Sequence, residues 1–238
     1  MSVLAVLGPR FVLEHLRTRL TLVLLVAIPA FFVLIFASVL GEFATALGGS
    51  LGEQAATAIS AGWAAAFLSG ALAFFEVVSS RGADRRLALA GLGAGSVALA
   101  RITAALSLAV VVSAVAFLTL ELRSGIAHPF HAAVAILGFA TIYIGIGALI
   151  GAFVTGALEG SLLVMLVFSV DVFSGPAMTS GGGLVASFTP TRKAADLLVA
   201  AGSGQTSPAG DWLTVAGIAL GALGVALAAF WFTARSRG

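Results

Sequence analysis

Ionisable residues are scarce in this chain, so those that stand in apolar surroundings are the first candidates for chemistry. The densest group lies between the second and third apolar runs and holds Arg81, Asp84, Arg85 and Arg86. A cluster with both signs of charge suits the reversible docking of a partner, because charges steer the encounter and fix its register. In the alternative interpretation, these arginines only set the membrane topology and contact lipid headgroups.

Asp171 is the second candidate, because it falls about ten residues inside an apolar run. At 1.5 Å per helical residue, this places it roughly 15 Å into a membrane, where a lone carboxylate costs several kcal/mol. Three interpretations stay open. Asp171 lines a pathway or a subunit seam, or it is buried in neutral form against a hydroxyl or Tyr143, or the helix is shorter and Asp171 lies near the outer interface.

Catalytic and metal chemistry finds no support in the sequence. A phosphate-binding loop, a nucleophile elbow and a His-Glu-x-x-His zinc helix are all missing, and the chain has no cysteine. His128 and His131 stand three apart beside Pro129, but without a third ligand nearby they are expected to be interface residues. We therefore expect neither an enzyme nor a resident cofactor or metal.

The elements that position these residues are apolar helices. Sixty per cent of the residues are apolar and only 9% are charged, which is typical of an integral membrane protein. Runs of about 20 apolar residues are long enough to cross the hydrocarbon core. We expect an all-α, single transmembrane domain over 1–238, with spans at 20–40, 58–78, 102–120, 132–154, 161–178 and 212–233.

The first 19 residues are expected to form an interfacial amphipathic helix. Apolar side chains recur at helical spacing from Leu4 to Leu16, which would give one face to the acyl boundary. Three arginines occupy other faces, namely Arg10, Arg17 and Arg19. The alternative is a simple lead-in to the first span.

Three details of the spans are also predicted. Trp63 is expected near a membrane interface, as aromatic residues often are. Glu76 is expected at the cytoplasmic interface, paired with Arg81 or Arg85. Gly147 and Gly151 form a Gly-x-x-x-Gly pair, which favours close helix packing.

The orientation follows from the placement of arginine. With six spans, both termini share one face, and that face holds nine of the twelve Lys and Arg residues, leaving Arg123, Arg192 and Lys193 on the other. The positive-inside rule makes the basic face cytoplasmic. We expect a multi-pass protein of the plasma (cytoplasmic) membrane with both termini inside.

Two stretches carry a family resemblance. Residues 81–89 read Arg-Gly-Ala-Asp-Arg-Arg-Leu-Ala-Leu and are followed by a glycine-rich turn at 91–96. Residues 187–190, Ser-Phe-Thr-Pro, precede a short amphipathic stretch at 194–201 in a partly helical outer segment between spans five and six. This layout resembles the type-2 ABC transporter permease family, in which an Arg-x-x-Gly-(Thr/Ser)-x-x-x-Leu pattern follows span two. Here the arginine and glycine are adjacent and the turn lacks its usual proline. Heme-exporter membrane subunits share the layout.

The resemblance implies half of a transmembrane pathway that pairs with a second permease subunit, identical or related. Separate ATP-binding cassette subunits would dock on the cytoplasmic face and bind ATP and Mg. The segment 81–100 would be a cytoplasmic coupling helix between spans two and three, and the N-terminal helix would be a lever on span one. Membrane lipids are expected partners and nucleic acid is not.

Two other functions compete with the exporter permease. A stand-alone secondary transporter or channel would be expected to show inverted repeats and several intramembrane charges, but no three-plus-three repeat is evident and only Asp171 is deep. A membrane anchor for a soluble complex would explain the basic loop but not the elaborate segment between spans five and six.

Overall fold

A computed structural model describes residues 19–46, 51–87, 91–174 and 189–235, which form seven helices and no strand. The helices are α2 (Arg19–Ala46), α3 (Glu53–Leu87), α4 (Ala94–Ser124), α5 (Pro129–Phe153), α6 (Ala157–Ser174), α8 (Arg192–Ser203) and α9 (Ala209–Arg235). Six of them, all except α8, are long and apolar enough to cross a membrane. The chain is therefore an all-α, multi-pass membrane protein, as its composition predicts.

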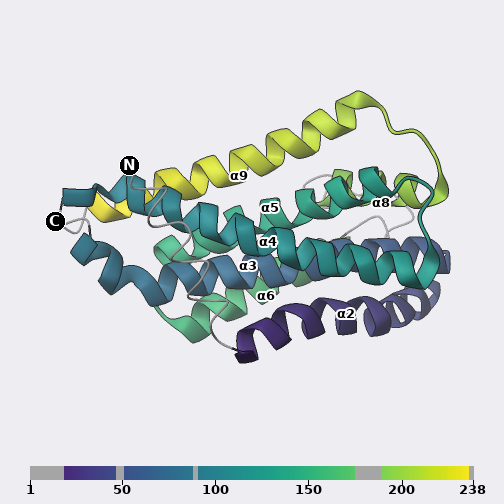
Figure 1. The fold of residues 1–238 in the computed structure, drawn as a ribbon, viewed down its shortest axis with the longest axis horizontal. Helices are drawn as coiled ribbons and strands as arrows, with labels where there is room; N and C mark the ends of the chain where they lie inside the picture. Colours follow the sequence, from purple (N-terminus) through teal and green to yellow (C-terminus); the bar gives the residue numbers. More distant parts are fainter. Residues whose placement is uncertain (1–18, 47–50, 88–90, 175–188, 236–238) are drawn as a thin grey trace.

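Two of the helices are much longer than the predicted spans. The 35 residues of α3 and the 31 residues of α4 extend about 52 and 46 Å at 1.5 Å per residue, against a hydrocarbon core of about 30 Å. The last turns of α3 and the first turns of α4 project together at the left end of the bundle in Figure 1. The basic stretch around Arg81 belongs to this projecting end.

The structure divides the expected coupling helix between two neighbours. Residues 81–87 continue α3 without a break, and residues 94–101 form the first turns of α4. Only six positions, 88–93, separate the two helices, which is too few for a separate helix of several turns. The prediction of a separate helix over 81–100 is therefore wrong, and a helical hairpin takes its place.

Helix α5 occupies the centre of the bundle. It packs against α3, α4, α8 and α9, and its buried residues lie on nearly every face, from Ala132 to Ala152. By contrast, α2, α6 and α9 expose many large apolar side chains, such as Phe31, Leu162 and Leu220. Apolar side chains exposed along a span are what a lipid environment favours.

Glycines let the central helices approach closely. A Cβ atom on Gly147 would collide with the backbone of Gly70, and one on Gly145 would lie 2.6 Å from Ala222. A Cβ on Gly151 would lie 2.9 Å from Val77, so the predicted close packing of the Gly147 and Gly151 pair is confirmed. Small residues of this kind allow helix backbones to meet in membranes, where no hydrophobic force drives helices together.

Two further predictions concern Trp63 and the N-terminal interfacial helix. Trp63 is fully buried with its ring against Phe36, so it faces the protein interior and not the lipid, and its position near a membrane interface stays a prediction. The predicted interfacial helix, with Arg10 and Arg17, lies outside the described residues, and Arg19 is the first residue of α2.

Candidate functional site

The charged end of α3 and α4 contains a buried ion pair. Arg101 Nη1 donates to Glu76 Oε1, and both side chains are only 8% exposed. Glu76 lies on α3 and Arg101 on α4, so the pair joins the two helices of the hairpin. The prediction that Glu76 is not buried is therefore wrong, and Arg101 is a partner that the sequence analysis did not name, while the predicted pairing with Arg81 or Arg85 stays a prediction.

Arg81 reaches from α3 to the end of α5. Its Nη2 donates to the carbonyl oxygen of Val154 at 2.6 Å and to that of Gly151. The last four carbonyls of a helix lack partners within the helix, and the negative end of the helix dipole favours a cation there. Arg81 thus caps α5 and fixes the hairpin to the central helix.

The four predicted docking residues differ in what the structure describes of them. Arg81 is half-buried and used within the chain, whereas Arg86 is exposed on the last turn of α3. Asp84 and Arg85 also lie on α3, but their side chains are outside the described part. Among the described side chains of this set, Arg86 is the one available to a partner.

A second polar cluster surrounds Asp171 near the end of α6. Asp171 Oδ2 accepts hydrogen bonds from the Tyr143 hydroxyl at 2.8 Å and from the Thr191 hydroxyl at 2.7 Å. All three side chains are at most 2% exposed. The predicted pairing with Tyr143 is observed, and Asp171 Oδ1 is buried without a hydrogen-bond partner in the described residues.

Helix α8 lies lengthwise against α5 in the right half of Figure 1. Near the end of α8, the Ala201 carbonyl accepts from the His128 backbone N–H at 3.1 Å. At the start of α8, Thr191 shares the acceptor Asp171 with Tyr143. Tyr143 lies about 22 Å beyond His128 along α5. The 12 residues of α8 span about 18 Å, so α8 runs antiparallel to α5 and its first turn lies well inside the bundle.

Sequence reasoning found the helix but missed its depth. The amphipathic stretch predicted from 194–201 is α8, with Ala194, Leu197 and Leu198 among its buried residues. Irregular chain at membrane depth is tolerated where protein covers it. Thr191 was also missed, although a threonine directly before a short amphipathic helix is a recognisable helix-start signal.

No family model matches the sequence, and no curated protein is significantly similar to it. The functional argument therefore depends on the geometry of the two polar regions and on the resemblance in layout.

The histidines do not build a metal site within the described residues. His128 and His131 have ring centroids 5.6 Å apart, and His128 Nε2 lies 3.3 Å from the Gly204 carbonyl oxygen. His131 instead packs its ring near Trp212, with centroids 5.5 Å apart. The described part of the chain contains no group of three or more ligand side chains suited to a metal ion.

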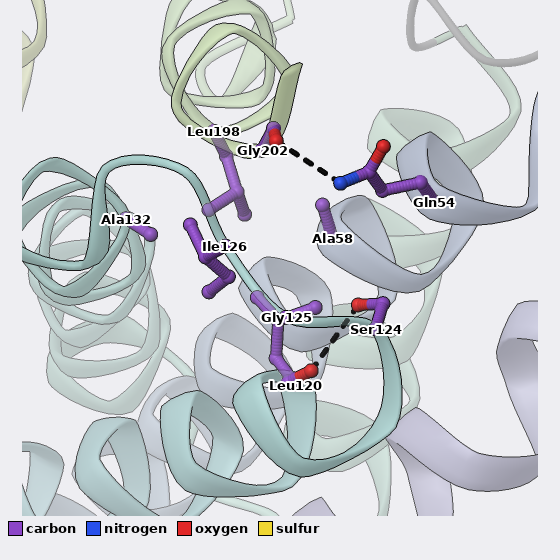
Figure 2. A pocket seen from close by; sticks show the side chains of 9 residues that line it. All are labelled: Gln54, Ala58, Leu120, Ser124, Gly125, Ile126, Ala132, Leu198 and Gly202. Carbon is purple, nitrogen blue, oxygen red and sulfur yellow. Dashed lines mark hydrogen bonds between the residues drawn. The ribbon is translucent and has the colours of Figure 1, made fainter. Parts of the chain in front are cut away.

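The seam beside the end of α8 is tightly closed. Gln54, at the start of α3, donates to the Gly202 carbonyl at 3.0 Å. Figure 2 shows this hydrogen bond with Ile126 and Leu198 alongside. The gap between these residues has no room for a water molecule. This seam anchors α8 to α3 and is not a ligand cavity.

Proposed function

We propose that the chain is the membrane-spanning permease subunit of an ATP-driven ABC exporter and forms half of a translocation pathway. The projecting α3–α4 hairpin is the observation that carries this proposal. It is longer than the hydrocarbon core and exposes Arg86 near its tip, and the Glu76–Arg101 pair joins its two helices. A docking element of this kind would transmit a displacement of the partner to the helical core.

The connection continues from the hairpin to the central helix. Arg81 caps the end of α5, so a displacement of α3 would move α5 directly. Separate ATP-binding cassette subunits would dock at the hairpin and hold the ATP and Mg, while this chain supplies the pathway. A second permease subunit and the surrounding lipids complete the expected assembly in the plasma membrane.

The test uses Arg86, the exposed arginine of the hairpin. The tagged chain is purified from its native membrane, and an ATP-binding subunit should co-purify with it. Arg86→Glu should lower the recovery of that subunit several-fold, because it reverses a charge at the docking surface. Gln205→Glu is the matched control, since Gln205 is an exposed loop residue at the opposite end of the bundle.

Two results would contradict the proposal. One is the absence of any ATP-binding subunit from the purified complex. The other concerns topology, because the chain has no native cysteine and a single Arg86→Cys variant reports its side cleanly. A membrane-impermeant maleimide that labels this cysteine from outside intact cells would put the hairpin on the wrong face.

A secondary transporter is the second candidate, and the α8 geometry favours it. Broken helices whose ends meet polar groups deep in a bundle are typical of such transporters, and α8 begins beside buried Asp171. The two functions differ in their energy source. Flux in vesicles that needs only an ion gradient supports this candidate, whereas flux that needs the ATP-binding subunit supports the exporter. In either case Asp171→Asn should lower flux without disrupting assembly if Asp171 lies on the pathway.

A further inference from the structure

A hollow of about 350 Å³ opens at the end of the bundle opposite the hairpin tip. It lies between the last turns of α2, the first turn of α3 and the end of α4. Its volume is within the range of small-ligand sites in proteins. The ionisable residues that line it are Glu42, Glu53 and Arg123.

Arg123 crosses from α4 to α2 at this hollow. Its Nη1 donates to the Leu34 carbonyl oxygen, and its Nη2 lies 3.4 Å from Ser38 Oγ. Glu53 Oε1 is 3.9 Å away, but the Glu53 side chain is 87% exposed, so this ion pair is weak. A guanidinium has five N–H donors, and the protein contacts leave several of them for an anion in the hollow.

Glu42 supplies the opposite charge. It is exposed on α2, lines the same hollow and forms no ion pair with the described residues. The hollow therefore combines two carboxylates with one guanidinium. A ligand that carries both an ammonium and an anionic group matches this pattern better than a simple anion or a simple cation.

The surroundings of the hollow indicate that the ligand is an amphiphile. Val39 and Phe43 lie on α2 beside the lining residues, and their side chains are 50% and 44% exposed. On α4, Leu122 is 88% exposed next to Arg123. Charged groups at the helix ends and bare apolar side chains beside them match the headgroup and the acyl chains of a lipid.

We propose that this hollow binds the headgroup of a zwitterionic lipid with a primary ammonium, of the phosphatidylethanolamine class. The phosphate would bind Arg123, and the ammonium would donate to Glu42 and Glu53. A choline headgroup fits less well, because it has no N–H donor and the residues that line the hollow include no aromatic cage. This inference does not depend on the proposed function.

The test compares short-chain lipids that differ only in the headgroup. Dihexanoyl phosphatidylethanolamine, phosphatidylcholine and phosphatidylglycerol are titrated onto the detergent-purified chain, and bound lipid is counted by native mass spectrometry. The wild-type chain should bind the ethanolamine lipid about tenfold more tightly than the choline lipid, the ratio that one charge-assisted hydrogen bond provides. Glu42→Gln should lower this ratio several-fold, because the ammonium loses one of its two carboxylate acceptors.

Two further variants complete the test. Glu159→Gln removes an exposed carboxylate at the start of α6, outside the hollow, and should keep the full ratio. Arg123→Gln should weaken all three lipids together, because each carries the phosphate. Equal wild-type binding of the ethanolamine and choline lipids would overturn the proposal. It would also be overturned if phosphatidylglycerol bound as tightly as phosphatidylethanolamine, or if Glu42→Gln left the ratio unchanged.

Discussion

The α3–α4 hairpin and the Asp171 region both place ionisable side chains inside a bundle of apolar helices, but they stabilise them in different ways. In the hairpin, Glu76 meets the opposite charge of Arg101, and Arg81 meets the carbonyls at the end of α5. At Asp171, the partners are the hydroxyls of Tyr143 and Thr191, and one carboxylate oxygen has no hydrogen-bond partner in the described part of the chain.

The difference separates a rigid region from one that is easier to rearrange. Separating a buried ion pair leaves an uncompensated charge, so the hairpin resists any motion that pulls α3 from α4. Neutral hydroxyls bond a carboxyl group less strongly than an opposite charge does, and water can replace them. We infer that the hairpin moves as one body and that the start of α8 is where a change of arrangement costs least.

The largest expected effect is at the Glu76–Arg101 pair. Arg101→Met alone should lower the free energy of unfolding by about 3–5 kcal/mol, because the buried Glu76 carboxylate would lose the opposite charge of Arg101. The Glu76→Leu and Arg101→Met double variant should recover most of this loss, since neither charge then remains. Thermal unfolding in detergent measures both. A double variant as unstable as the single one would mean that the ion pair is not the source of the rigidity.

The next largest effect on the free energy of unfolding is expected where α5 contacts α3, between the two regions. Gly147→Ala should cost about 1–3 kcal/mol, because the added methyl group meets the backbone of Gly70 and pushes α5 away from α3. Gly221→Ala on α9 is the matched control, since a Cβ there meets no atom within 4 Å. Equal stability of the two variants would show that α5 is not held by close packing.

The sequence is sufficient to predict the helical class, the number of spans and the close packing of Gly147 and Gly151, because these follow from hydropathy and residue size. It does not predict that α3 and α4 extend past their apolar cores, since helix continues through polar residues once a neighbour supports it. The buried pair of Glu76 with Arg101 is missed for a related reason. The two residues are 25 positions apart, and only the packing of the hairpin brings them together.

Asp171 shows how far one residue can be interpreted from sequence. Burying a carboxylate in an apolar run costs free energy, which predicts that Asp171 needs a polar partner. Tyr143 is such a partner. The second partner, Thr191, directly precedes a helix that the sequence analysis places in an outer segment. The fold of α8 back along α5 depends on contacts of residues such as Leu198 with distant helices, which no local pattern encodes.

Removing a hydroxyl partner of Asp171 should lower the free energy of unfolding less than breaking the ion pair does. Thr191→Val should cost about 1–2 kcal/mol, the value of one buried hydrogen bond, and should loosen the first turn of α8. A single cysteine introduced at Ala195, which is 1% exposed, reports this loosening through its alkylation rate. The rate should rise several-fold with Thr191→Val and stay unchanged with Thr214→Val, whose hydroxyl only bonds its own helix. An unchanged rate in Thr191→Val would show that Asp171 does not hold α8.

The smallest expected effect on stability is at Asp196 on α8, and it depends on pH. Burial raises the pKa of the Asp196 carboxyl above its usual value, and Asp211 adds to this, while Lys193 and Arg192 oppose it. The folded chain therefore holds this proton more tightly than the unfolded chain, so stability falls as the pH rises above about 4 through the raised pKa. Asp196→Asn should remove this fall and slightly raise the unfolding temperature near neutral pH, because the neutral amide has no proton to lose. Unfolding measured from pH 4 to 7 would contradict the assignment if both chains changed in parallel.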